Sequence, residues 1–257
     1  MLKVHKVMIP KLTGRRKRNL YIYLPDSYDQ DPERRYPVLY MFDGHNVFVD
    51  EESSFGKSWG LYDYMNFTET ELIVVGIECN HDPDNGRLKE YAPYSFNDPQ
   101  YGKIVGKGKL TMDWIVRWLK PQIDKRYRTM PFRETTFIGG SSMGGLMSLY
   151  AILAHNDIFS RAAALSPSIW ANKREIDYLI RTSSVDENTI IYMDYGSEEF
   201  SNHKGMQPLY NKTVASLLKK GIFLTSRIVP YGDHSEASWE KQLPLMMETL
   251  MYGIYDE

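Results

Sequence analysis

Residues 135–154 read TTFIGGSSMGGLMSLYAILA, and this stretch decides the fold. Its apolar start predicts a buried strand at 135–140, and the apolar remainder predicts a buried helix. Between them stands a G-x-S-x-G string at 140–144, centred on Ser142. The glycines admit a strained turn and a close helix, so we expect the Ser142 hydroxyl to project from the end of the strand. A small-residue turn that only joins a strand to a helix is the alternative.

The rest of the chain alternates apolar runs with helical stretches. Runs that suit strands buried on both faces lie at 36–43, 72–78, 135–140, 162–167, 189–196 and 225–232. Helical stretches lie at 112–127, 142–156 and 209–221. This alternation predicts an α/β fold with a mostly parallel sheet. The sequence contains no repeat and no linker-like shift in composition, which predicts one domain over residues 1–257.

The first 25 residues predict a hairpin of two further strands, which brings the sheet to about eight. Residues 4–10 and 19–25 flank the basic run 13–18. Basic runs can bind nucleic acid, but the place of this one between two strands favours a solvated hairpin tip.

The composition excludes several classes of protein. The chain has 257 residues, and 31 Lys and Arg against 33 Asp and Glu give a formal net charge of −2. A charge so near balance disfavours binding to nucleic acid. A single cysteine cannot form an intrachain disulfide or a zinc ribbon. Because no apolar run reaches 18 residues and the first segment carries Lys3, His5 and Lys6, we expect no membrane span, no secretory signal and a cytoplasmic location.

A serine hydroxyl becomes a nucleophile only where a base accepts its proton. In strand–turn–helix sites the partners follow in the order serine, acid, histidine. His155 stands near the far end of the helix, roughly 20 Å from Ser142, and His203 leaves no room for a strand between itself and a preceding acid. His234 follows the last predicted strand, where catalytic groups belong. His234 is the predicted base, and a solvated loop histidine is the alternative.

The acid is expected just past the strand at 189–196, where it would orient the imidazole and stabilise the imidazolium. Glu199 is the first choice, Glu198 the second and Asp194 the third. Asp194 still belongs to the predicted strand, so its carboxylate would point along the sheet. A merely solvated carboxylate is the alternative reading.

Two backbone N–H groups are expected to stabilise the developing alkoxide. One belongs to Met143, the residue after the nucleophile. The other is expected from the loop after the strand at 36–43, where Gly44 permits a sharp turn and His45 follows it. The side chain of His45 is expected to line the substrate pocket.

Further motifs agree with this arrangement, in order, between about residue 18 and residue 245. They are YMFDGHNVF, EYAPY, LKPQIDKRYR, FIGGSSMGGLMSLYA, LSPSIW, YGSEEF and GDHSEASW. With this set the chain resembles the esterase-D-like esterases of the α/β-hydrolase superfamily, a group that includes feruloyl, acetyl-xylan and enterobactin-type siderophore esterases. The resemblance implies an α/β-hydrolase fold with helices on both faces of the sheet. It places the nucleophile on Ser142, the acid on Glu199, the histidine on His234 and the oxyanion amides on His45 and Met143.

These observations predict a serine esterase that forms an acyl-enzyme and needs no cofactor. Acetyl or hydroxycinnamoyl esters of carbohydrates are the expected small-molecule substrates, largely through the resemblance. A siderophore trilactone esterase, a thioesterase or an acyltransferase would use the same triad. A non-catalytic binding protein of this fold is an alternative of another class. The sequence predicts no oligomeric state.

The aromatic side chains make up 13% of the chain, and six of them stand on segments expected to surround Ser142. We expect these six to line the substrate pocket: Phe48, Trp59, Tyr91, Tyr94, Trp170 and Trp239. The segment 79–109 has no clear period and is a candidate lid. No metal is expected, because H-E-x-x-H and H-x-H spacings do not occur, and Cys79 reads as a buried small residue.

Overall fold

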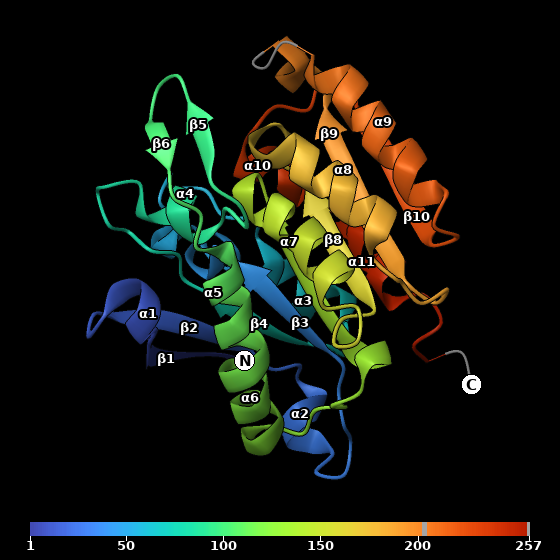
Figure 1. Cartoon of the computed structure of the whole chain (residues 1–257). Helices are drawn as coiled ribbons and strands as arrows, with labels where there is room; N and C mark the ends of the chain where they lie inside the picture. The colour runs from blue at the N-terminus through green and yellow to red at the C-terminus, as the bar shows by residue number, and fades with distance from the viewer. Residues whose placement is uncertain (202–204, 256–257) are drawn as a thin grey trace.

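The computed structural model describes residues 1–201 and 205–255, and one eight-stranded sheet runs through them (Figure 1). The strand order is β1-β2-β4-β3-β7-β8-β9-β10. The strands are β1 Leu2–Met8, β2 Lys17–Tyr23, β3 Val38–Phe42, β4 Ile73–Ile77, β7 Thr136–Ser141, β8 Arg161–Leu165, β9 Ile190–Gly196 and β10 Phe223–Val229. β2 pairs antiparallel with β1 and with β4, and every pair from β4 to β10 is parallel. The predicted α/β fold with a mostly parallel sheet is confirmed.

Helices cover both faces of the sheet, as expected (Figure 1). One face packs against α5 Gly108–Trp114, α6 Lys120–Arg126, α7 Met143–Ala154, α8 Lys173–Thr182 and α9 Met206–Leu218. The other packs against α3 Leu61–Thr68, α10 Glu236–Glu240 and α11 Leu243–Met251. Side chains of β3 alternate between the two layers, with Tyr40 in the first core and Met41 in the second. A strand apolar at every position suits this double burial.

Short elements connect these layers. They are α1 Pro10–Thr13, α2 Ser27–Gln30, α4 Gly86–Glu90 and the strands β5 Phe96–Asp98 and β6 Gly102–Ile104. The last three show that the segment 79–109 contains regular structure, including the β5–β6 hairpin. A lid role for this segment stays a prediction. Among the described residues, no helix is both long and apolar enough to cross a bilayer.

The N-terminal hairpin differs from the sequence expectation at one position. β1 and β2 pair as predicted, with α1 in the connection between them. However, Arg18 is only 3% exposed and donates to both carboxylate oxygens of Glu90, at 2.7 and 2.9 Å. The prediction that the whole basic run 13–18 is a solvated tip is therefore wrong for Arg18, because β2 turns this side chain toward α4.

Candidate active site

The nucleophile candidate lies in the sharp turn between β7 and α7. β7 ends at Ser141, α7 begins at Met143, and Ser142 between them has φ 59° and ψ −121°. A positive φ is strained for a serine. Three backbone hydrogen bonds hold the residue there: its N–H donates to Leu165 O at 2.9 Å, and its carbonyl accepts from Leu146 and Ser168, each at 3.0 Å.

At Gly140 and Gly144 the neighbouring atoms leave too little room for a side chain. A Cβ at Gly140 would lie 3.0 Å from the Gly144 backbone, and a Cβ at Gly144 would lie 3.0 Å from Cβ of Phe42. Such distances are tighter than normal van der Waals contact. Glycine at both positions therefore lets α7 start directly behind the strand.

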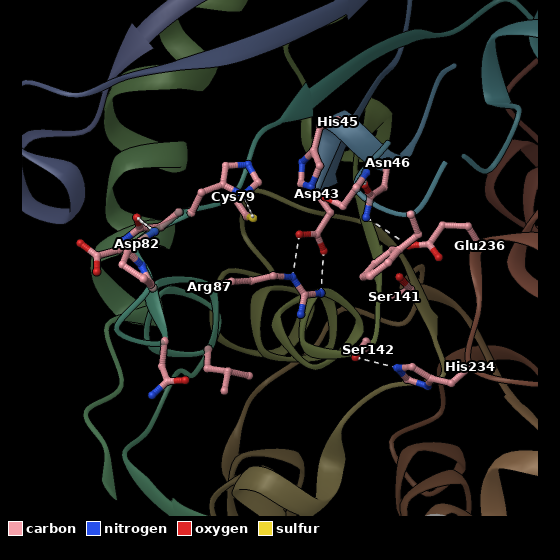
Figure 2. A pocket seen from close by; sticks show the side chains of 18 of the residues that line it. Asp43, His45, Asn46, Cys79, Asp82, Arg87, Ser141, Ser142, His234 and Glu236 are labelled. Atoms are coloured by element: carbon pink, nitrogen blue, oxygen red, sulfur yellow. Dashed lines mark hydrogen bonds and ion pairs between the residues drawn. The ribbon is translucent and has the colours of Figure 1, made fainter. Parts of the chain in front are cut away.

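His234 reaches Ser142 from the loop that follows β10. The distance between its Nε2 and the Ser142 Oγ is 2.9 Å (Figure 2). On the other side of the ring, Nδ1 lies 2.5 Å from Oε2 of Glu199. A carboxylate only accepts hydrogen bonds, so Nδ1 carries the proton and Nε2 is free to accept the Ser142 hydroxyl proton.

Glu199 is the buried member of an acidic pair. It lies in the 3₁₀ turn Ser197–Ser201 with 1% exposure, whereas Glu198 is exposed. Its Oε1 accepts the Gly196 N–H at 2.9 Å and the Ser166 hydroxyl at 2.6 Å, which leaves Oε2 for His234. Every oxygen of this carboxylate thus has a donor, as burial of a charge requires.

Ser166 and Trp239 form a second layer behind the acid. Ser166, at the end of β8, has φ 42°, and its Oγ accepts the Trp239 indole N–H at 2.9 Å while donating to Glu199. The Trp239 ring also meets the His234 ring edge to face at 5.1 Å. Sequence reasoning missed Ser166, and the only signal for it was its place at the end of a predicted strand.

Asp194 lies beneath this layer and does not contact His234. Its oxygens accept the Ser166 N–H at 3.1 Å and the Tyr192 hydroxyl at 2.8 Å. Burial raises the pKa of Asp194 to about 7. Because Tyr192 and Asp194 are two residues apart on one face of β9, the carboxylate lies over that face of the sheet.

The two expected oxyanion donors lie in the first turns of helical segments. Met143 is the first residue of α7, so its N–H has no acceptor within the helix. His45 belongs to the 3₁₀ turn Gly44–Asn46, whose bonds run from Asn46 to Asp43 and from Val47 to Gly44 and leave the His45 N–H out. The cavity is lined by His45 and by Ser142.

Asp43 fixes the turn that carries His45. It has φ 55°, and its two oxygens accept from Nε and Nη2 of Arg87, at 2.8 and 2.7 Å (Figure 2). Burial alone would raise the pKa of Asp43, but the paired Arg87 outweighs it and holds that pKa below its usual value. The Asp43 N–H donates to the Tyr91 hydroxyl at 3.1 Å. Tyr91 therefore supports this turn from the core instead of lining the pocket.

The cavity beside Ser142 has a volume of about 410 Å³, and its walls carry both polar groups and apolar side chains such as Phe55 and Leu88. Of the six aromatic residues expected there, the structure brings only Trp239 to its wall. Three others, Phe48, Trp59 and Tyr91, are 2% exposed or less and lie in the core. Tyr94 and Trp170 pack beside Tyr150 and Phe96, outside this cavity.

Several polar residues that sequence reasoning did not select also lie on the walls. They include Asn46, Asn80, Asp82, Asn85, Arg87 and Glu236. Asn46 donates to Glu236 at 3.1 Å, which links the His45 turn to the segment after His234. Burial raises the pKa of Glu236. His203, considered and rejected as a base, lies outside the described residues.

Comparison with known proteins identifies the family of the chain. Residues 13–250 match the model of the family described as "Putative esterase". Uncharacterized protein YbbA of Bacillus subtilis (strain 168) is 30% identical over 199 residues, which cover 74% of this chain and 72% of that protein. Ferri-bacillibactin esterase BesA of the same organism is 24% identical, over 80% of this chain and 75% of its own length.

Among solved structures, a ferulic acid esterase superimposes with a TM-score of 0.70 at 17% sequence identity. The superposition covers 97% of both chains, which shows a shared α/β-hydrolase fold. Together with the family match over most of the chain, these findings confirm the resemblance read from the motifs. The chain belongs to this esterase family, and with it to the carboxylic-ester hydrolases.

Proposed function

We propose that the protein is a serine esterase in which Ser142 is the nucleophile, His234 the base and Glu199 the acid that orients it. The observation that carries this proposal is the unbroken chain of contacts from Ser142 Oγ to His234 at 2.9 Å and from His234 to Glu199 at 2.5 Å. Nucleophile, base and orienting group within hydrogen-bond reach are the requirements for covalent acyl transfer.

The reaction runs in two halves. Ser142 Oγ bonds to the ester carbonyl carbon while its proton passes to Nε2 of His234, and the carbonyl oxygen becomes an oxyanion next to the His45 and Met143 amides. The C–O bond to the alcohol then breaks, and His234 returns the proton to the leaving oxygen. Water attacks the acyl-enzyme, gives a proton to His234, and the acid leaves as Ser142 Oγ recovers that proton.

The polar groups on the cavity wall suit an ester whose alcohol portion carries many hydroxyl or amide groups, such as an acetylated sugar. A hydroxycinnamoyl ester has fewer matching groups, because the wall offers two aromatic rings, Trp239 and Phe55, beside a larger set of polar side chains. A siderophore-type ester is the second candidate substrate, favoured by Arg87 and the asparagines on the wall and by the similarity to BesA.

The test of the triad is Ser142→Ala, assayed on an aryl acetate. We expect kcat to fall roughly 10⁶-fold, because the nucleophile of a triad acts as one unit with its base. Ser148→Ala is the matched control, since the Ser148 hydroxyl donates to Gly144 O inside α7 and does not line the cavity. Retention of wild-type turnover by Ser142→Ala contradicts the triad, whereas a wild type that turns over none of the tested esters favours the non-catalytic binding protein.

The same preparation decides among substrates. Aryl acetate, methyl ferulate, acetylated xylo-oligosaccharide and a catecholate trilactone are compared by kcat/KM in parallel. We expect the acetylated sugar or the trilactone to exceed methyl ferulate. A preference for methyl ferulate contradicts the inference drawn from the polar groups on the wall.

A further inference from the structure

Three side chains with metal-binding atoms meet on the cavity wall: His45, Cys79 and His81. One donor atom from each lies within 4.8 Å of the other two. In Figure 2 the Cys79 sulfur and the His45 imidazole lie on one side of the cavity, and Ser142 and His234 lie on the other. None of the three side chains has a part in the proton transfers described above.

The topology of the sheet brings these residues together. β3 and β4 are parallel neighbours whose last residues, Phe42 and Ile77, are paired in register. His45 lies in the 3₁₀ turn directly after β3, and Cys79 and His81 lie in the segment directly after β4. Since the carboxyl ends of parallel strands meet at one edge of a sheet, both segments reach the same part of the cavity.

Within the described part of the chain, one nitrogen of the His45 ring lacks a hydrogen-bond partner, although it is buried. The side chain is 5% exposed, and its Nδ1 has no hydrogen-bond partner among the residues that the structure describes. Buried polar atoms are nearly always paired, because an unpaired one forfeits its hydration. A ligand in the cavity that accepts the ring's lone pair would satisfy this group.

His81 already has the orientation of a metal ligand. Its Nε2 lies 3.3 Å from Oε1 of Glu78, and its Nδ1 lies 3.9 Å from Sγ of Cys79. Ligating histidines typically hold a carboxylate at the second ring nitrogen. On a tetrahedral zinc ion the nitrogen and sulfur ligands are roughly 3.5 Å apart, given Zn–N and Zn–S bonds of about 2.0 and 2.3 Å. The observed distance of 3.9 Å between His81 Nδ1 and Cys79 Sγ is close to this value.

We propose that His45, Cys79 and His81 bind one divalent cation of the zinc type. Two imidazoles and a thiolate suit such a borderline-soft ion. Binding forms the sulfur–metal bond as the thiol proton of Cys79 leaves to solvent. Three protein ligands leave the fourth tetrahedral position open, and in this cavity that position holds a water molecule.

The test measures metal binding by the full chain, independently of ester hydrolysis. The metal-free protein is titrated with Co²⁺ and followed by absorbance, and with Zn²⁺ in competition and in thermal unfolding. We expect one Co²⁺ per chain with a thiolate-to-cobalt charge-transfer band. We also expect a Tm that rises with Zn²⁺, because an ion that binds only the folded state stabilises it.

Four variants locate the site. Cys79→Ser should abolish the charge-transfer band, His81→Gln should weaken Zn²⁺ binding at least about 10-fold, and Glu78→Gln should weaken it roughly 10- to 100-fold through the lost carboxylate partner. His155→Gln, at the far end of α7, is the matched control and should bind as the wild type does.

Two results overturn the proposal. One is the absence of stoichiometric binding of both ions by the wild type, and the other is binding whose affinity neither Cys79→Ser nor His81→Gln changes. His81 is exposed, so His81→Gln decides the matter if Cys79→Ser fails to fold. Because no assay here uses a substrate, failure of this site and failure of the triad are distinguishable.

Discussion

Glu199 and Glu198 are neighbours in one 3₁₀ turn, yet only Glu199 faces the sheet. A Cβ at Gly196 would lie 2.8 Å from Oε1 of Glu199 and 2.3 Å from O of Gly232, so glycine lets this turn pack against the loop before His234. The Glu198 N–H donates to Gly232 O at 3.0 Å, which fixes which of the two side chains points inward.

The two glutamates therefore offer a matched pair of variants. Glu199→Gln should lower kcat on the order of 10⁴-fold, because an amide opposite Nδ1 no longer holds the required tautomer. Glu198→Gln removes the same charge one residue away and should keep kcat within a few-fold. The measurement is kcat on an aryl acetate for both variants. A large loss in Glu198→Gln with little in Glu199→Gln would reassign the acid.

For single residues, the sequence predicts which segment carries a site residue. It predicts less well where the side chain of that residue points. Chain order and strand ends select Ser142 and His234 for the contacts that the structure shows. The aromatic residues were harder to place, because the position of a residue on a segment does not predict whether its ring points into the core or into the cavity. Phe48 follows the His45 turn as expected, yet its ring packs on Tyr21 in the core, with the centroids 6.0 Å apart.

Elements were predictable where apolar runs mark buried strands. The runs at 72–78 and 189–196 contain β4 and β9, because a strand covered on both faces is apolar throughout. The helix at 112–127 is interrupted by a π-helical turn at Ile115–Leu119, just before Pro121, which has no N–H to donate. The tertiary contact of a single polar residue, such as Arg18, leaves no comparable pattern in the sequence and so was not predicted.

The ion pair of Arg18 and Glu90 joins β2 to α4. Arg18→Met should lower the free energy of unfolding by about 3 kcal/mol or more, because Glu90 is left buried without its cation. The double variant Arg18→Met/Glu90→Leu should recover most of this loss, since it leaves no buried charge. Urea unfolding of the two variants at about pH 9, above the pKa of about 7 that Glu90 has beside Arg18, measures both effects. A single variant as stable as the wild type would show that the pair contributes nothing.

Across the whole molecule, one sheet joins residues from β1 to β10, and both cores pack on it. We propose on this basis that the chain folds as one domain. Two carboxyl groups lie in nearly dry surroundings, Asp194 in β9 and Glu90 in α4. Burial raises the pKa of Asp194 to about 7, and it raises the pKa of Glu90 to about 7 against the pull of Arg18.

These carboxyls link the stability of the fold to pH. A folded pKa of about 7 for Asp194, against 3.8 as the ordinary value, means that the folded state keeps a proton which the unfolded state loses. Its contribution to stability is fully present below about pH 4 and is lost as the pH rises through 7. Asp194→Asn has no such proton. The free energy of unfolding of this variant, relative to wild type, should therefore rise by up to about 4 kcal/mol between pH 4 and pH 8.

Urea unfolding at both pH values measures this difference. The same substitution at the exposed Asp157, Asp157→Asn, is the control and should show no such difference. A relative stability that stays constant or falls with pH would mean that Asp194 is ionised in the folded protein throughout this range.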